Sequence, residues 1–97
     1  MNRDSVDWHG PMPAITTPFC DDLSLDEAAF MANARRLFDA GSTGIVVGGC
    51  TGEFWSLSLD ERARLARWAA KVSRGRGTVI MGTGSISADE VIEQIHT

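Results

Sequence analysis

Residues 44–61 read GIVVGGCTGEFWSLSLDE, and most of the fold follows from this stretch. Its first four residues are apolar without polar alternation, which is typical of a strand buried on both faces of a parallel sheet. Residues 48–53 form a glycine-rich segment. Residues 58–61 then show the Ser-x-x-Glu spacing of a capping box, with which helices begin. The sequence therefore predicts a buried strand, a loop and a helix, in that order.

The same order of strand and helix recurs on both sides of this stretch. The β-rich run 13–17 precedes a capping box that begins at Ser24, and the run 78–81 precedes one that begins at Ser87. The strands are expected to start near residues 13, 44 and 78, which is the spacing of βα units with right-handed crossovers. We expect three βα units in one organisational unit. The periodicity fits either a (β/α)8 barrel or a doubly wound sheet.

Each of the first two helices is expected to bury one face. After Ser24, apolar residues recur at helical spacing until Gly41, which supplies a C-terminal stop: Ala28, Phe30, Met31, Ala34, Leu37 and Phe38. After Ser58, the apolar set is Leu59, Ala63, Leu65, Ala66, Ala69 and Val72. The solvated side of this second helix is expected to carry Arg62, Arg64, Arg67 and Lys71.

Composition and charge indicate a globular protein and disfavour two classes of binding partner. The 97 residues are 43% hydrophobic and 23% charged, as in an ordinary globular protein rather than a disordered one. The formal net charge of -4 disfavours nucleic acid and anionic membrane surfaces as partners, because both are themselves negative. No apolar run reaches the roughly 20 residues of a membrane span, and no apolar signal region begins the chain, so we expect a cytoplasmic protein.

The cysteines and histidines do not form a metal-binding pattern. Cys20 and Cys50 lack CxxC spacing, and no histidine lies near either of them in the sequence. We therefore expect free thiols that are buried or half-buried, with a disulfide or a zinc site as the alternative. His9 and His96 are expected to be surface or terminal residues.

The loop 48–53 is the segment best suited to chemistry. It follows a buried strand, and α/β proteins place their sites at the carboxyl ends of such strands. Its glycines let the backbone turn sharply and expose N–H groups, and Thr51 adds a hydroxyl, which together suit a small carboxylate or phosphate. The segment matches neither GxxxxGK[ST] nor GxGxxG, so it is neither a P-loop nor a dinucleotide fingerprint. The alternative is that the glycines only permit a tight turn.

Three stretches of the chain resemble one enzyme family. Residues 49–53 (GCTGE), with the Leu-Ser and Glu-Arg pairs at 57–58 and 61–62, are similar to the G-[TS]-T-G-E…L-[ST]…E-R signature of the dihydrodipicolinate synthase and N-acetylneuraminate lyase family. Residues 14–19 (AITTPF) resemble that family's first strand, and residues 82–85 (GTGS) resemble the loop after its third strand. All three stretches occur in the family's order and spacing.

This resemblance, which covers residues 11–97, implies a fold and an activity. It implies that residues 1–97 are the N-terminal part of a single α/β domain, the first three βα units of a (β/α)8 TIM barrel. Members of the family are usually homotetramers that join pyruvate or another 2-oxo acid to a lysine as a Schiff base. They then make or break a carbon–carbon bond, or dehydrate a sugar acid. No metal or organic cofactor is expected, because the protonated imine itself accepts electrons.

The resemblance also implies roles for residues of the loop. The position that matches Thr51 binds the carboxylate of the 2-oxo acid through its hydroxyl and neighbouring N–H groups, so Thr51, Gly49 and Gly52 are the expected substrate-binding residues. The position that matches Cys50 is usually a threonine or serine of the proton relay. A thiol is a weaker hydrogen-bonding group than a hydroxyl, so Cys50 as a catalytic residue implies an altered relay. This departure favours an aldolase or dehydratase for a sugar-acid-like substrate over strict dihydrodipicolinate synthase activity.

Four side chains near this loop have alternative interpretations. Cys50 as a nucleophile is disfavoured, because no histidine accompanies it. Glu53 is either a general acid or base, or an acceptor of backbone N–H bonds that holds the loop, and the structural role is favoured. Phe54 and Trp55 either line the mouth of a substrate site or fill a core or subunit interface, and the second role is favoured.

The expected imine-forming lysine is missing from the sequence. Lys71 is the only lysine, it falls on the polar side of a helix, and the chain has no tyrosine. The resemblance places the lysine and the relay tyrosines later in the family's chain, so we expect the 97 residues alone to be inactive. Three interpretations remain: a fragment of a lyase, a non-catalytic piece that binds a small carboxylate or other subunits, and a free-standing α/β domain.

Overall fold

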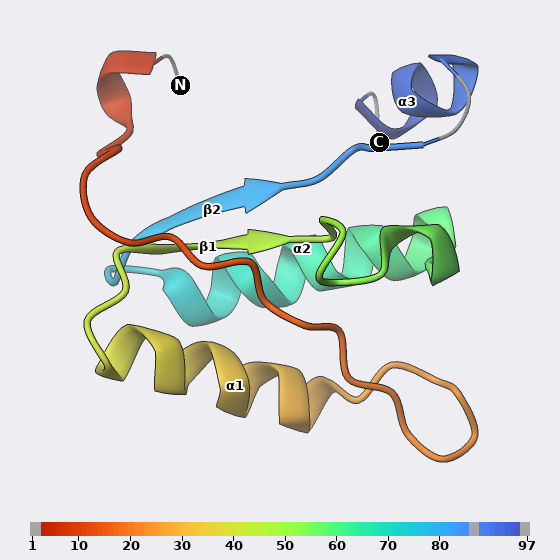
Figure 1. Cartoon of the computed structure of the whole chain (residues 1–97), viewed down its shortest axis with the longest axis horizontal. Helices are drawn as coiled ribbons and strands as arrows, with labels where there is room; N and C mark the ends of the chain where they lie inside the picture. The colour runs from red at the N-terminus through yellow and green to blue at the C-terminus, as the bar shows by residue number, and fades with distance from the viewer. Residues whose placement is uncertain (1–2, 86–87, 96–97) are drawn as a thin grey trace.

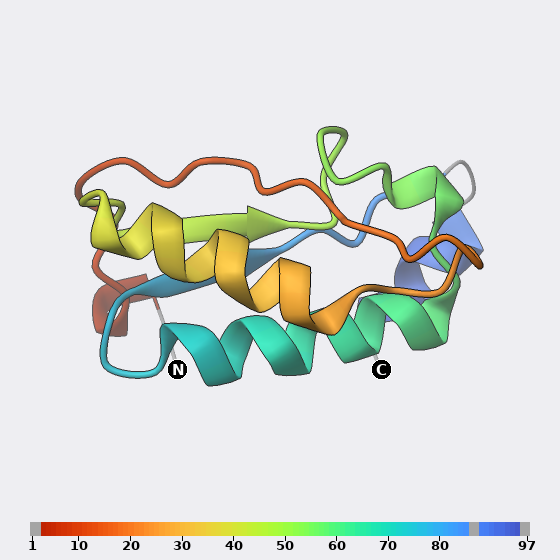
Figure 2. The ribbon, with the colours of Figure 1, turned by 90° about the horizontal axis from the view of Figure 1, so that it is seen from below.

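Two parallel strands and two long helices form the centre of the computed structural model, which describes residues 3–85 and 88–95 (Figure 1). The elements, in chain order, are η1 (Arg3–Ser5), α1 (Glu27–Asp39), β1 (Gly44–Val47), η2 (Phe54–Ser56), α2 (Leu59–Ser73), β2 (Thr78–Met81) and α3 (Ala88–Ile95). Strands β1 and β2 pair in parallel, from Gly44 opposite Thr78 to Val47 opposite Met81. Figure 2 shows α1 and α2 side by side on one face of this sheet. The predicted order of strand and helix is therefore confirmed from β1 to β2.

The first predicted strand, residues 13–17, does not form as a strand. The segment runs beside β1 and makes one isolated parallel bridge, between Ala14 and Val46. Its backbone bonds there are Ile15 N–H to Val46 O at 3.0 Å and Val46 N–H to Pro13 O at 2.9 Å. A proline has no N–H to donate and restricts the residue before it, which explains why the ladder stays so short. The segment lies where the predicted first strand was expected, with less regular pairing.

The start of α1 also differs from the prediction. Asp26, and not Ser24, is the N-cap, and its carboxylate accepts the N–H of Ala29 at 2.9 Å. The Ser24 hydroxyl instead donates to the Asp22 carboxylate at 2.6 Å. A charged carboxylate is favoured at the positive end of a helix, and aspartate caps helices as readily as serine does. The sequence spacing alone was therefore ambiguous here.

The predicted capping box of α2 is confirmed. Ser58 is the N-cap, its hydroxyl accepts the Glu61 N–H at 3.1 Å, and the Glu61 carboxylate accepts the Ser58 N–H at 2.9 Å. The corresponding Ser87 lies outside the described residues. The helix that follows it, α3, leaves Ile92 and Ile95 exposed.

The core lies between the sheet and the two long helices. The largest completely enclosed side chains of the described residues come from α1, β1 and α2: Phe30, Ile45, Val47 and Leu65. Met31, Ala34, Phe38, Ala69 and Val72 are also buried, as their helical spacing predicted. Two predictions about the helix faces were wrong: Ala28 is exposed, and Arg62 is buried. Among the residues that the structure describes, no helix combines the length and apolar character needed to cross a membrane.

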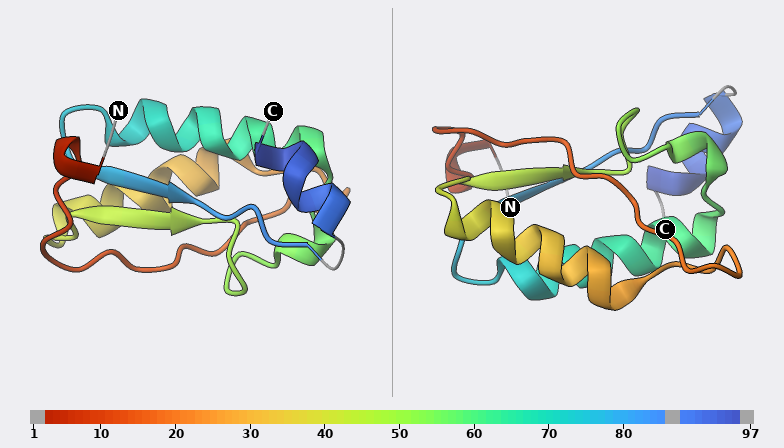
Figure 3. Two further views of the ribbon diagram at one scale, coloured as in Figure 1. Left: turned by 90° about the horizontal axis from the view of Figure 1, so that it is seen from above. Right: turned by 60° about the horizontal axis from the view of Figure 1, so that its bottom comes forward.

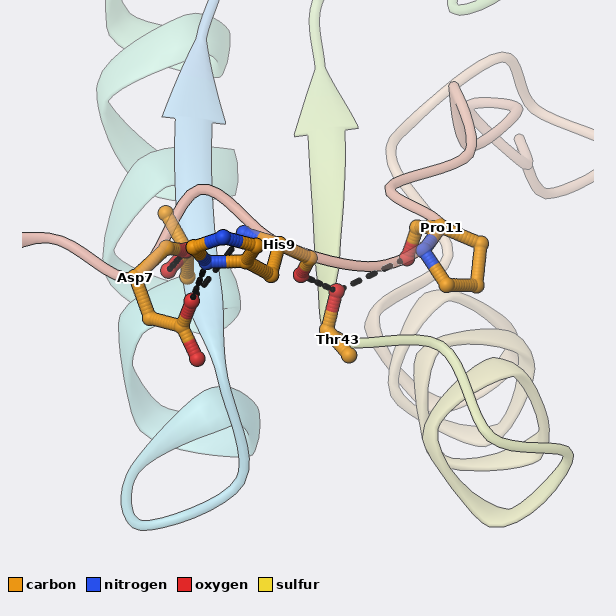
Figure 4. Close-up of polar contacts among 5 residues, drawn as sticks. Asp7, His9, Pro11 and Thr43 are labelled. Carbon is orange, nitrogen blue, oxygen red and sulfur yellow. Dashed lines mark hydrogen bonds and ion pairs between the residues drawn. The ribbon is translucent and has the colours of Figure 1, made fainter.

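The segment before the first bridge crosses the N-terminal ends of both strands (Figure 4). The Thr43 hydroxyl lies 2.7 Å from the carbonyl oxygen of His9 and 3.2 Å from that of Pro11. The Thr78 hydroxyl lies 3.3 Å from the carbonyl oxygen of Asp7. The chain is thus fastened at the end of the sheet opposite the glycine-rich loop, and His9 is exposed there, as predicted.

Candidate binding site at the carboxyl ends of the strands

The glycine-rich loop 48–53 projects from the carboxyl end of β1, as Figure 3 shows. Its turn is closed by backbone bonds: the Glu53 N–H donates to Cys50 O at 3.0 Å, and the Phe54 N–H donates to Gly49 O at 3.3 Å. Gly48 has a φ of 68°, in the left-handed region where a side chain would be strained. The strand therefore turns away sharply and presents residues 49–51 at its end.

Thr17 fastens this loop to the segment beside β1. Its hydroxyl donates to the carbonyl oxygen of Gly52 at 2.7 Å, and both residues are buried. A Cβ on residue 52 would lie 3.1 Å from the Thr17 hydroxyl oxygen and 3.2 Å from Ile15 O, so only glycine fits without displacement. Sequence reasoning did not single out Thr17. The available signal was a hydroxyl side chain at the carboxyl end of the first β-rich run.

The loop after β2 packs directly against the loop after β1. The Gly82 N–H donates to Val47 O at 2.7 Å, which extends the parallel pairing past the last strand residue. A Cβ on residue 82 would lie 2.4 Å from Gly48 O, closer than any side chain tolerates. Residues 82–85, which the sequence analysis compared with a family loop, therefore border loop 48–53.

Arg62 of α2 connects the loop after β1 to the loop after β2. It lies in the first turn of α2 with 8% of its surface exposed, and its guanidinium donates to Phe54 O and to Gly84 O, each at 2.7 Å. The guanidinium carbon also lies 5.4 Å from the centre of the Phe54 ring. Burial lowers the pKa of Arg62, and the charge of Glu90 opposes that shift. Helical spacing predicted Arg62 on the solvated side of α2, because spacing cannot show which side chains the flanking loops cover.

The predicted site residues are together at this end of the sheet. Thr51 and Cys50 are exposed, Gly49 is half-buried, and Gly52 is buried beneath them. Both Cys50 and Cys20 are free thiols, as predicted, but the expectation that they are buried or half-buried was wrong. Cys50 is exposed because the turn carries it beyond the sheet.

The residues that follow the turn have partly unexpected roles. Glu53 was expected to hold the loop through its carboxylate, but it makes no side-chain cap and acts through its backbone, with φ at 57°. Phe54 is half-buried and meets Trp55 edge-on, with ring centres 5.2 Å apart. Trp55 is 62% exposed, so it fills no core within the described residues. Lys71 is exposed on α2, as predicted, and His96 lies outside the described residues.

The exposed residues Thr51 and Cys50 do not line either of the two pockets nearby. These pockets, of about 290 and 440 Å³, lie on the α2 side. Both pockets border Arg62 and Leu59. Within residues 3–85 and 88–95, no three His, Cys, Asp or Glu side chains gather as a metal site would require.

Parallel strands with a hydroxyl-bearing glycine loop at their carboxyl ends define the class of this protein: an α/β fold with its candidate site in the strand-to-helix loops. The sequence profile of the dihydrodipicolinate synthetase family matches residues 7–96. The chain therefore belongs to this family, whose members are lyases and synthases.

Curated relatives agree with this assignment. The chain is 42% identical over 92 residues to an uncharacterized DapA-like lyase from Rhizobium meliloti, covering 95% of this chain and 31% of that protein. It is 43% identical over 88 residues to the 4-hydroxy-tetrahydrodipicolinate synthase of Hyphomonas neptunium, covering 91% and 30%. The chain thus spans about three tenths of the length of the curated relatives that it matches.

Solved structures of TIM-barrel enzymes share the fold of this chain. A dihydrodipicolinate synthase from Bacillus anthracis superposes with a TM-score of 0.83 at 36% identity, covering 92% of this chain and 30% of that one. A chloride-inhibited dihydrodipicolinate synthase from Acinetobacter baumannii, complexed with pyruvate, gives 0.82 at 32%, covering 88% and 29%. An N-acetylneuraminate lyase from Mycoplasma synoviae gives 0.80 at 32%, covering 90% and 30%.

Proposed function

We propose that this chain supplies the carboxylate-binding loop of a lyase that joins pyruvate or another 2-oxo acid to a lysine as a Schiff base. In this proposal, residues 1–97 are the N-terminal part of a single (β/α)8 domain, and the whole protein is a homotetramer. Support comes from the family match over residues 7–96 and from the relative that was solved with pyruvate.

The main support for the proposal is that Thr51 is exposed on a turn whose neighbouring residues are held by hydrogen bonds. The Thr51 side chain reaches solvent, whereas the adjacent Gly52 is buried and bonded to Thr17. A hydroxyl held on a fixed glycine turn can donate to a carboxylate without first being ordered, which lowers the entropic cost of binding. Gly49 and Gly52 let the backbone come close to the ligand, because neither carries a Cβ.

Cys50 is the proposed point of divergence from the family's proton relay. Its exposure next to Thr51 supports this proposal, because an exposed thiol is accessible to a bound substrate. An S–H group is a weak hydrogen-bond donor, so the proton must travel through another group or at a lower rate. We therefore propose an aldolase or dehydratase acting on a sugar-acid-like substrate, with no metal or organic cofactor.

Borohydride reduction in the presence of pyruvate tests the Schiff-base proposal. Reduction converts an imine into a stable amine, which intact-protein mass spectrometry detects and peptide mapping assigns to one lysine. The 97-residue chain should form no adduct at Lys71 and show no turnover, because Lys71 is exposed in the last turn of α2, whereas the loop 48–53 precedes the first turn. The chain extended by the coding sequence that follows it in frame should form one adduct, at a lysine beyond residue 97.

Each outcome has a distinct meaning for the proposal. An adduct on the extended protein alone supports a Schiff-base lyase whose N-terminal part is this chain. Turnover of any 2-oxo acid by the pure 97-residue protein contradicts the proposal that the imine-forming lysine lies beyond residue 97. Binding of pyruvate by the extended protein without an adduct points instead to a non-catalytic protein that binds small carboxylates.

A further inference from the structure

Arg62 is a charged side chain that is buried, and its guanidinium donates hydrogen bonds to two separate loops. Arginine is rarely enclosed in a protein unless its donors are satisfied, because burying the charge is costly. Here one guanidinium nitrogen donates to Phe54 O and the other to Gly84 O, both at 2.7 Å. Those carbonyl groups belong to the turn after β1 and to the segment after β2.

The shape of the guanidinium makes this connection rigid. Its N–H donors lie in one plane at fixed angles, and hydrogen bonds from a charged donor are stronger than neutral ones. Its stacking on the Phe54 ring, at 5.4 Å, restrains the same turn from a second direction. A lysine ammonium could reach one carbonyl group but could not span both with the same geometry.

We infer that Arg62 is a positioning residue that clamps the loop bearing Thr51 to the loop after β2. The loop 48–53 is held near its start, where Gly48 packs against Gly82, and near its end, where Arg62 holds Phe54. Thr51 lies between these two points of attachment. The part of the inference that concerns ligand binding rests on the proposed function, whereas the clamping of the two loops does not.

The size of the effect follows from the population of the clamped arrangement. When a binding-competent conformation is only partly populated, the apparent Kd rises by the inverse of that fraction. If loss of the clamp leaves the loops correctly placed about one tenth of the time, the apparent Kd for pyruvate rises about tenfold. Local opening of both loops should become about tenfold more frequent for the same reason.

Hydrogen exchange of single amides in the full 97-residue chain tests the clamp directly. Two amides report on the two loops: the Phe54 N–H, bonded to Gly49 O, and the Gly82 N–H, bonded to Val47 O. In Arg62→Gln, both should exchange about tenfold faster, whereas amides in the middle of α2 should keep their rates. Arg62→Lys should restore part of the protection, because the ammonium can still donate to one of the carbonyl groups.

Arg64 provides the matched control on the same helix. It stacks on Trp68 at 5.3 Å and pairs with Asp60 at 3.9 Å, so its partners lie on α2 and not in the loops. Arg64→Gln should leave both reporter amides unchanged. Equal acceleration of all amides in Arg62→Gln would reduce Arg62 to a contributor to global stability and overturn the inference, as would unchanged rates at both reporters. If Arg62→Gln does not fold, the same comparison applies to Arg62→Lys and Arg64→Lys.

A pyruvate titration on the same samples separates this inference from the proposed function. An increase of about tenfold in Kd for Arg62→Gln, with Arg64→Gln unchanged, supports both. If the wild-type 97-residue chain does not bind pyruvate, carboxylate binding by the loop of this chain alone is contradicted, the Schiff-base proposal is decided by the adduct on the extended protein, and the clamp is judged by amide exchange alone. If pyruvate binds equally to both variants, Arg62 does not position the loop for binding, and that part of the inference is wrong.

Discussion

Replacement of Thr17 by valine should destabilise the chain measurably although it preserves the shape of the side chain. The hydroxyl of Thr17 donates to Gly52 O at 2.7 Å in a buried position. Valine removes this donor and leaves the carbonyl oxygen without its partner. An unpaired buried acceptor costs about 1–3 kcal/mol, and the added methyl group returns up to ~0.8 kcal/mol of apolar burial. The expected net loss in the free energy of unfolding is therefore about 1–2 kcal/mol.

Urea denaturation of three variants measures this loss. With a slope of about 1–2 kcal/mol per molar urea for a chain of this size, the midpoint of Thr17→Val should fall by about 1 M. Thr17→Ser keeps the hydroxyl and should lose less. Thr16→Val is the matched control, because Thr16 is the exposed neighbour, and it should stay within about 0.5 kcal/mol of the wild type. Equal midpoints for Thr16→Val and Thr17→Val would refute the role assigned to this hydrogen bond.

Three further predictions concern backbone contact, helix capping and acid titration. Gly82→Ala should destabilise by about 1–3 kcal/mol in urea denaturation, because its Cβ would lie 2.4 Å from a backbone oxygen; wild-type stability would contradict the loop contact. Asp26→Ala should cost about 1 kcal/mol and Ser24→Ala under 0.5 kcal/mol, and the reverse order would restore Ser24 as the cap. The pKa of Asp7 lies below 3.8, first because its carboxylate accepts the backbone N–H of His9 and then through the His9 ring. The small contribution of Asp7 to the free energy of unfolding is therefore present above about pH 3.8, and it is lost as the pH falls through the lowered pKa of the folded state. NMR of the Asp7 carboxyl group should show a titration midpoint below 3.8, whereas a midpoint of 3.8 would contradict these hydrogen bonds.

The sequence predicted the regular centre of the fold because local signals agreed there. The run Ile45-Val46-Val47, the capping box at Ser58 and the apolar spacing around Leu65 all indicate the same arrangement, and the structure confirms each of them. The first strand was over-predicted, because a β-rich composition does not reveal how far proline limits its pairing. The cap of α1 was misplaced because Ser24 and Asp26 offer competing local signals.

The position of the candidate site was predicted from the sequence, but the contacts that hold its loop were not. Glycines with a hydroxyl after a buried strand marked loop 48–53 as the place for chemistry, and that loop is where Thr51 and Cys50 reach solvent. The contacts that hold the loop were missed, because they join residues far apart in the sequence. Thr17 meets Gly52 across 35 positions, and Arg62 meets Gly84 across 22. Helical periodicity assigns a side chain to a face, but long-range packing decides whether that face is covered.

A pyruvate titration of the 97-residue chain, followed through the backbone amide signals of residues 49–52, tests directly whether this loop binds a carboxylate. We expect these signals to shift and saturate with pyruvate, but not with its uncharged methyl ester. Thr51→Ser should bind similarly and Thr51→Val about ten- to a hundredfold more weakly, which is the range for losing a hydrogen bond to a charged group. Shifts of equal size with the ester, or equal affinity in Thr51→Val and Thr51→Ser, would contradict carboxylate binding at this loop.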